Sequence, residues 1–435
     1  MRVNFFRQPF SSQRLPGRRG VLQLGLVALL LGVASPAPNA SAHAGAEPRH
    51  WVGTWSASPM AADAAGDQTN DGFSNQTLRQ IAHVSIGGDR VRVRLSNAFG
   101  TTPLVIGAAH VALQSDAAAI VPESDRALSF AGQPSVVIPP GALVLSDAVE
   151  LAVPSLGNLA VSVFVPEETG PTTWHQLGTQ STFVSAPGDF TAAAELPIAA
   201  VNQSWFWLSG IEVQASRRAF SVVTLGDSIT DGYGSTLDAN RRWPDLLSAR
   251  LNAAGTRARH APVEVGVLNQ GISGNRLLHD QFGQNASARF DRDVLAAPGA
   301  RHVIVMIGIN DLGFPGAFGV PDEAVEAADI QRGLGFLVER AHAQGLRIHA
   351  ATLAPFEGTS FPGYYTLEGE AKRQAINAWV RDSNTFDSVI DFDAVLRDPA
   401  RPTQLLPAFD SGDHLHPNDA GYAAMANAID LGELR

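Results

Sequence analysis

Serine, aspartate and histidine side chains stand in this chain at positions from which they can perform nucleophilic catalysis together. Ser228 lies in the run Gly226–Gly232, whose glycines permit a tight turn that exposes a hydroxyl group. Asp413 precedes His416 by three residues, so one short loop can hold the carboxylate against one imidazole nitrogen while the other nitrogen faces a serine. A serine nucleophile needs such a base, and the base needs an orienting group. The pattern predicts a catalytic triad of Ser228, Asp413 and His416.

Each of these segments also has a purely structural interpretation. Asp227 or Ser228 can cap a helix that follows it. The polar loop before the last predicted helix can cap that helix, with Pro417 in its first turn. His414 and His416 can be read as a metal-binding pair, but no third cluster of ligand residues is apparent in the sequence. We therefore predict no metal and no cofactor.

Attack on an ester carbonyl creates an oxyanion, which needs hydrogen-bond donors already in place. Two further glycine-containing polar segments follow predicted strands and can supply such donors. The backbone N–H of Gly274 and the side-chain amide of Asn310 can join the backbone N–H of Ser228 in an oxyanion hole. Gly271 is the competing glycine in the first of the two segments. Read separately, each segment is an ordinary glycine-rich loop.

The second half of the chain alternates apolar, strand-like runs with helical stretches. The predicted strands are Phe220–Leu225, Val263–Leu268, His302–Ile307, Leu346–Leu353 and Ser388–Phe392. The predicted helices cover residues 243–254, 322–344, 367–382 and 418–431. Strands separated by helices imply right-handed crossovers and a parallel sheet covered on both faces. Ser228, Gly274 and Asn310 then lie at the same end of this sheet, where open parallel sheets bind ligands.

The first half looks all-β, because residues 51–213 contain short alternating stretches between Gly, Pro, Asn and Asp. Ala82–Ile86 and Val91–Leu95 alternate on both sides of a glycine-containing turn, which predicts a hairpin. A second alternating run, Leu159–Val165, ends at Pro166. Several short strands in succession predict a β-sandwich or jelly roll.

The N-terminal segment has the features of an export signal. The first 44 residues carry five arginines and no acidic residue, and Ala42–Ala44 forms a small-x-small cleavage site. The apolar run Val21–Val33 is shorter than the roughly 20 residues that span a bilayer, which argues against a stable membrane anchor. Arg18 and Arg19 resemble a twin-arginine signal, so the route stays open. We predict a secreted or periplasmic protein with a signal peptide at 1–44, a β-sandwich accessory domain at 48–216 and an α/β domain that carries the predicted triad at 217–435.

Charge and composition exclude several classes of function. The formal net charge of −11 becomes more negative by five when the predicted signal peptide is removed, and Lys372 is the only lysine. Nucleic acids and anionic membranes need clustered basic residues, so we expect neither as a partner. The chain has no cysteine, which excludes disulfides, thiolate metal sites and cysteine nucleophiles.

Four motifs taken together resemble the conserved blocks of the GDSL, or SGNH, hydrolase family, and they occur in the family's order. These motifs are Gly226-Asp227-Ser228, Gly274, Gly308-x-Asn310-Asp311 and Asp413-x-x-His416-Pro417. The resemblance spans roughly half of the chain, from about Phe220 onward. It implies a flavodoxin-like three-layer α/β/α domain with a parallel sheet.

The resemblance also implies roles for individual residues. Ser228 would be the nucleophile, His416 the general base and then the general acid, and Asp413 the group that orients the histidine. Ser228, Gly274 and Asn310 would form the oxyanion hole. Family members usually place the glycine directly after a serine, which favours Gly274 over the competing glycine.

The N-terminal half, with its segment Trp51–Trp55, is similar to a β domain that precedes the hydrolase domain in some secreted bacterial members, including xylan-esterase-like ones. Such a domain can bind sugar, shape the cleft or support the fold. We predict a secreted serine esterase that removes short acyl groups, typically acetyl, from a polysaccharide or small-molecule substrate. The alternatives are a lipolytic or aryl esterase, a lysophospholipase-like enzyme, an acyltransferase and a non-catalytic binding protein.

Two loops rich in Gly, Pro and aromatic residues, Leu312–Val320 and Phe356–Tyr365, are expected to line the cleft. Their aromatic side chains can stack on sugars or pack against an acyl chain, or they can anchor the loops in the core. These side chains are Phe314, Phe361, Tyr364 and Tyr365.

Overall fold

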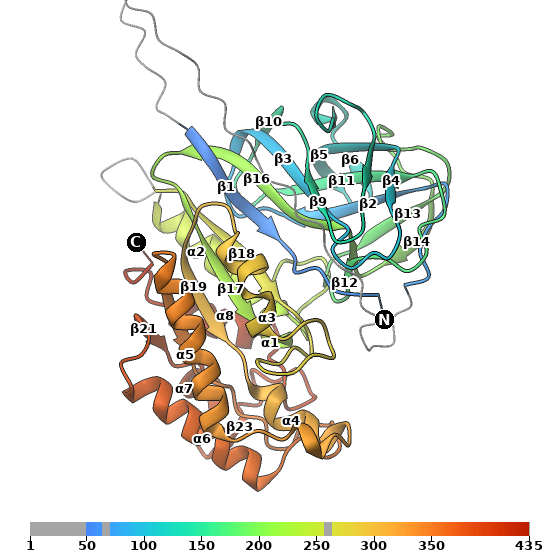
Figure 1. Cartoon of the computed structure of the whole chain (residues 1–435). Coiled ribbons are helices and arrows are strands. Elements are labelled where there is room, and N and C mark those ends of the chain that lie inside the picture. The colour runs from blue at the N-terminus through green and yellow to red at the C-terminus, as the bar shows by residue number, and fades with distance from the viewer. Residues whose placement is uncertain (1–48, 63–69, 256–262, 435) are drawn as a thin grey trace, which may run out of the picture. The chain divides into compact units, whose positions relative to one another are not determined.

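The computed structural model describes residues 49–62, 70–255 and 263–434 (Figure 1). The predicted signal peptide at 1–44 lies outside these residues. The described residues belong to one compact unit. Among the described residues, no helix has both the length and the apolar character that a membrane span requires.

Two antiparallel sheets make up the first half of the described chain. The first sheet has the strand order β1-β16-β3-β10, with β9 also paired to β3, and the second has the order β14-β13-β2-β11-β5-β6, with β7 also paired to β5. The strands of the first sheet are β1 (Arg49–Ser56), β16 (Leu208–Ser216), β3 (Gly88–Ser96), β10 (Val149–Val153) and β9 (Leu143–Leu145). The strands of the second are β14 (Ile198–Asn202), β13 (Thr182–Pro187), β2 (Gln76–His83), β11 (Asn158–Val165), β5 (Ala108–Asp116), β6 (Ala119–Ile120) and β7 (Arg126–Ala127).

The two sheets share one apolar core, as expected of a sandwich. Val93 of β3 and Val213 of β16 belong to the same buried cluster as Val111 of β5 and Val163 of β11. Two small two-stranded ribbons complete this half, β12 (Trp174–His175) with β15 (Trp205–Phe206) and β4 (Leu104–Ile106) with β8 (Val136–Ile138). A 3₁₀ turn covers Pro122–Ser124. The all-β character predicted for this half is confirmed, including the strand at Leu159–Val165.

The predicted hairpin between Ala82–Ile86 and Val91–Leu95 is wrong. Ala82 and His83, before the turn, are the last residues of β2, which pairs with β11 and β13. Val91–Leu95, after the turn, lie in β3, which pairs with β16, β10 and β9. The chain thus crosses from one sheet to the other. Both strands alternate because each turns one face to the shared core, and alternation does not identify the partner of a strand.

The second half is built on a five-stranded parallel sheet with the order β18-β17-β19-β20-β21. This order, 2-1-3-4-5 along the chain, is that of flavodoxin. The strands are β17 (Phe220–Gly226), β18 (Val265–Gly271), β19 (Ala300–Met306), β20 (Arg347–Ala351) and β21 (Ser388–Ile390). An antiparallel pair, β22 (Arg397–Asp398) and β23 (Arg401–Leu405), follows. The parallel sheet predicted from the sequence is confirmed.

Helices cover this sheet and bury their apolar sides in one core with it. Helix α2 packs with α8, and α5 packs with α6 and α3. Right-handed crossovers in this strand order place the two groups on opposite faces of the sheet. The helices are α1 (Ser228–Asp231), α2 (Trp243–Gly255), α3 (Ala286–Phe290), α4 (Ile309–Ala317), α5 (Ala327–Ala343), α6 (Leu367–Asp382), α7 (Phe392–Leu396) and α8 (Asp419–Ala428), with a π-helical turn at Asp291–Leu295 and a 3₁₀ turn at Pro321–Glu323.

Two local expectations differ from the structure. The helix expected at 322–344 begins at Ala327, because Glu326 and Asp329 form a capping box there, while Pro321–Glu323 forms a separate 3₁₀ turn. The segment expected as the loop Leu312–Val320 lies largely within α4, in spite of Pro315. The helix is stabilised by tertiary packing, since Phe314 is buried in a cluster of aromatic side chains.

Candidate active site

Ser228 is the first residue of α1 and directly follows the central strand β17. Asp227 caps this short helix, with its carboxylate accepting a hydrogen bond from the N–H of Ile229 at 3.1 Å. Gly226 is required for the turn, because a Cβ at this position would lie 2.7 Å from the carbonyl oxygen of Met306. The capping interpretation therefore holds for Asp227 and leaves the hydroxyl of Ser228 available to another partner.

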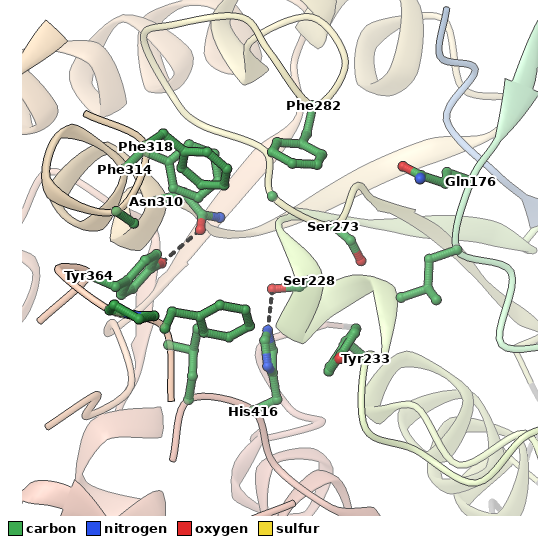
Figure 2. A pocket seen from close by; sticks show the side chains of 16 residues that line it. Gln176, Ser228, Tyr233, Ser273, Phe282, Asn310, Phe314, Phe318, Tyr364 and His416 are labelled. Atoms are coloured by element: carbon green, nitrogen blue, oxygen red, sulfur yellow. Dashed lines mark hydrogen bonds between the residues drawn. The ribbon is translucent and has the colours of Figure 1, made fainter. Parts of the chain in front are cut away.

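His416 is that partner. Its Nε2 lies 2.8 Å from Ser228 Oγ, and its Nδ1 lies 2.6 Å from Asp413 Oδ2 (Figure 2 shows the serine and the histidine). The second carboxylate oxygen of Asp413 accepts hydrogen bonds from the backbone N–H groups of Leu415 and His416. The structure thus brings together the three residues predicted as a triad, with Nδ1 placed to donate and Nε2 placed to accept.

The electrostatic environment keeps Asp413 ionised. Burial by itself raises the pKa of this carboxyl group, but the hydrogen bond from the His416 ring, its charge and the two backbone N–H donors outweigh burial and hold the pKa well below its usual range. A carboxylate at this position fixes the proton of the imidazole on Nδ1 and stabilises an imidazolium ion.

Asn310 and Gly274 follow the strands on either side of β17, as expected. Asn310 lies in the first turn of α4, where its Nδ2 donates to the carbonyl of Asn275 at 2.9 Å and its Oδ1 accepts from the hydroxyl of Tyr364 at 2.7 Å. These two contacts orient the amide nitrogen toward the cavity beside Ser228 (Figure 2). Gly274 has a φ of +79°, a conformation that favours glycine, and it also lines the cavity.

Asp311, next to Asn310, ties two of the polar segments together. Its buried carboxylate accepts from the backbone N–H groups of Leu277 at 2.7 Å and Leu278 at 3.0 Å. Burial raises the pKa of this group to about 6, in spite of these hydrogen bonds. Asp311 does not line the cavity; through its two hydrogen bonds it positions the backbone near the site.

A cavity of about 460 Å³ opens beside the serine and the histidine (Figure 2). Its volume falls within the range of cavities that bind small molecules. Aromatic side chains dominate one side of it. The lining residues are Gln176, Leu177, Ser228, Tyr233, Ser273, Gly274, Phe282, Asn310, Phe314, Ala317, Phe318, Phe361, Pro362, Tyr364, Leu415 and His416.

The aromatic residues singled out in the sequence divide between the two roles considered for them. Phe314 and Tyr364 line the cavity and are buried at the same time, and Phe361 lines it from a more exposed position. Tyr365 does not line the cavity but packs against Phe356, with 5.0 Å between the ring centroids.

Sequence reasoning missed several lining residues. Gln176 and Leu177 belong to the β half, and no signal in the sequence connects them with a site that lies mostly in the other half. Phe318 lies within Leu312–Val320, a segment expected to line the cleft, but was not singled out there, and Phe282 lies outside the recognised motifs.

The structure also shows where the residues behind the competing interpretations lie. Gly271 ends β18 away from the cavity, packed against the backbone of Asp231. His414 contacts Asp410, and its ring does not bond to that of His416. Within residues 49–62, 70–255 and 263–434, no group of three or more metal-ligand side chains is arranged to hold a metal ion.

Comparison with known proteins gives a family match in the second half of the chain. Residues 224–424 match the model of the GDSL-like Lipase/Acylhydrolase family. No curated protein matches the chain.

Among solved structures, the chain is similar to a GDSL-like lipase from Bacteroides thetaiotaomicron (19% identity over 49% of this chain and 87% of that one, TM-score 0.36). It is similar to a mutant acetylxylan esterase from Geobacillus stearothermophilus (23% identity over 49% and 94%, TM-score 0.37). It is also similar to the aryl esterase of M. smegmatis (16% identity over 48% and 95%, TM-score 0.38).

Proposed function

We propose that this chain, whose residues 224–424 match the model of the GDSL-like Lipase/Acylhydrolase family, hydrolyses carboxylic esters through an acyl-enzyme on Ser228. The observation that carries the proposal is the continuous contact from Asp413 through His416 to Ser228 Oγ, at 2.6 Å and 2.8 Å, beside a cavity of about 460 Å³. A nucleophile, an oriented base and a space for the reacting group are what acyl transfer requires.

In the proposed reaction, Ser228 Oγ attacks the ester carbonyl while Nε2 of His416 accepts the hydroxyl proton. The oxyanion that forms is stabilised by the N–H groups of Ser228 and Gly274 and by Nδ2 of Asn310. The histidine then protonates the alcohol, which leaves. Water, deprotonated by the same histidine, attacks the acyl-enzyme and releases the acid.

The lining of the cavity favours an ester with an apolar acyl or aryl group larger than acetyl. Phe282, Phe314 and Phe318 contact one another, with ring centroids 4.6–5.9 Å apart, on the side of the cavity next to Asn310. Aromatic rings bury apolar surface, and an acetyl group has little to bury there. This supports the lipolytic or aryl esterase among the alternatives considered from the sequence.

A short acyl group on a carbohydrate remains the second candidate. The side chains of Gln176, Ser273 and Tyr233 line the other side of the cavity and supply an amide and hydroxyl groups that can bind a sugar. The sequence features of an export signal support the further proposal that the enzyme acts outside the cytoplasm.

The test is hydrolysis of a nitrophenyl ester series from acetyl to dodecanoyl, with Ser228→Ala as the control. We expect turnover to rise from acetyl toward medium-length chains and to be lost in Ser228→Ala. A maximum at acetyl would select the carbohydrate candidate, and acetylated xylan would then be assayed. Equal turnover by both proteins would exclude Ser228 as the nucleophile.

A further inference from the structure

His175, a residue of the β half, is buried against the segment that carries the nucleophile. It lies in β12 and is only 3% exposed. Its Nδ1 lies 2.9 Å from the carbonyl oxygen of Ser58, and its Nε2 lies 2.9 Å from Oδ1 of Asp231. The carbonyl oxygen of Ser58 and a carboxylate at Asp231 are hydrogen-bond acceptors, so both ring nitrogens of His175 are placed to donate.

His175 and Asp231 therefore form a buried ion pair between the two halves. Burial lowers the pKa of His175, but the charge of Asp231 and the hydrogen bonds from His175 to Asp231 and Ser58 raise it overall. Asp231 is 2% exposed. Buried ion pairs add little net stability compared with apolar side chains, because both charges lose their hydration. The presence of this pair is better explained by the geometry that it imposes.

That geometry concerns the oxyanion hole. Asp231 ends α1, three residues after Ser228. Its second carboxylate oxygen accepts from the backbone N–H of Ser273 at 2.9 Å and from the Ser273 hydroxyl at 2.8 Å. Ser273 directly precedes Gly274. The carboxylate thus links the helix of the nucleophile to the loop whose next residue, Gly274, lines the cavity.

We propose that His175 is a positioning residue of the active site: by holding the Asp231 carboxylate, it fixes the Ser273–Gly274 segment so that the Gly274 N–H points to the oxyanion. This inference rests on the proposed function. It gives the β half a part in catalysis, because the segment that carries His175 continues into Gln176 and Leu177, which line the cavity. The Asp231 carboxylate thus contacts His175 from one half and orders backbone in the other.

Other contacts between the halves provide a matched control. Ser85 of the β half is buried, and its Oγ accepts a hydrogen bond from the N–H of Val267 at 2.9 Å, in the middle of β18. This contact is polar and crosses the same boundary, but it does not reach the loop that contains Gly274. Ser85→Ala should lower the melting temperature and leave turnover per active site unchanged.

The decisive variant is His175→Gln in the full chain, which removes the positive charge and keeps a polar side chain. Active sites are counted with a fluorophosphonate, so that unfolded protein does not enter the rate. We expect kcat per site to fall about 10- to 100-fold with KM within twofold, because removing a whole oxyanion donor costs on the order of 10²–10³ in kcat and here a donor is displaced. The inhibition constant of butylboronic acid, which forms a tetrahedral adduct on the serine, should rise by the same factor as kcat/KM falls.

Ser273→Ala provides a second test in a half-buried position that does not endanger folding. It removes one of the two hydrogen bonds that Ser273 donates to Asp231, and we expect kcat per site and boronate affinity to fall together, about three- to tenfold. The inference would be overturned if Ser273→Ala left kcat per site unchanged and His175→Gln either left kcat per site unchanged or gave no folded protein. Ser228→Ala is assayed beside these variants. Activity that survives in Ser228→Ala would contradict the proposed function itself, which is a different outcome from failure of the inference about His175.

Discussion

The hydroxyl of Tyr364 offers a quantitative test of the proposed oxyanion hole. It donates to Oδ1 of Asn310 at 2.7 Å, and both residues are buried. Burial raises the pKa of Tyr364 well above its usual range, so the hydroxyl remains a donor at every pH used in an assay. Tyr364→Phe keeps the ring in the cavity wall and removes only this bond.

The magnitude follows from the contacts of the amide. Without the hydroxyl, Asn310 Oδ1 is a buried acceptor without a partner, which costs about 1–3 kcal/mol, while Nδ2 keeps its bond to the carbonyl of Asn275. If roughly 1 kcal/mol of this cost appears as lost orientation in the transition state, kcat falls about fivefold, since 1.36 kcal/mol corresponds to a factor of ten. Asn310→Ala removes the donor itself and should lower kcat about 10²- to 10³-fold.

The assay is a double-mutant cycle on hydrolysis of nitrophenyl butyrate, with sites counted by fluorophosphonate. If Tyr364 acts through Asn310, then Tyr364→Phe lowers kcat about fivefold in the wild type and not at all in Asn310→Ala. Tyr365→Phe is the control, because its ring neighbours the same loop and does not line the cavity. An equal effect of Tyr364→Phe in both backgrounds would refute the reasoning, and so would its absence from the wild type.

Three further predictions concern the triad, the cavity and the stability of the fold. Asp413→Asn should lower kcat about 10³- to 10⁴-fold at an unchanged melting temperature, because an amide N–H facing Nδ1 of His416 moves the imidazole proton to Nε2; a loss below tenfold would remove Asp413 from the triad. Phe318→Ala should lower kcat/KM several-fold for octanoyl esters and leave kcat/KM for acetyl esters unchanged. Phe318 is half exposed at the cavity, and removing its ring loses apolar burial only for the longer acyl chain. An equal effect on both esters would place the apolar group elsewhere. The rings of His302 and His349 share a 3.0 Å hydrogen bond, and burial lowers the pKa of each from 6.5 to about 4. Between pH 6.5 and pH 4 the unfolded chain therefore binds protons that the folded chain does not. Stability is lost as the pH falls through this window, by roughly 3 kcal/mol for one histidine. Between pH 7 and pH 5, the free energy of unfolding measured in urea should therefore fall less for His349→Gln than for the wild type. An equal fall in both proteins would contradict this origin.

Local pattern determined much of what the sequence could predict. Apolar strand runs followed by polar, glycine-containing turns predicted the parallel sheet and the end of it at which Ser228, Gly274 and Asn310 lie. Asp413 and His416 are three residues apart in one loop, so their contact depends little on the rest of the fold. These features are local or follow from the handedness of crossovers, and both can be read from a single sequence.

Pairings between distant segments could not be read in this way. Alternation in β2 and β3 reports one buried face, which any partner strand satisfies, so the predicted hairpin was wrong. The start of α5 depended on which of several acidic residues formed the capping box. The partner of each strand was chosen by packing in the folded chain, and the start of α5 by one local capping box among several that the acidic residues allowed.

Tertiary structure alone decided what surrounds the chemistry. The sequence by itself predicted a serine and two donors at the end of one sheet, and a histidine and an acid in one loop that faces the serine. Only the folded chain brought Gln176 and Leu177 from the β half to the same cavity, and set His175 against Asp231 across 56 residues. The physical reason is that a binding wall and a buried ion pair depend on desolvation between surfaces that meet only after folding, for which adjacent residues carry no signal.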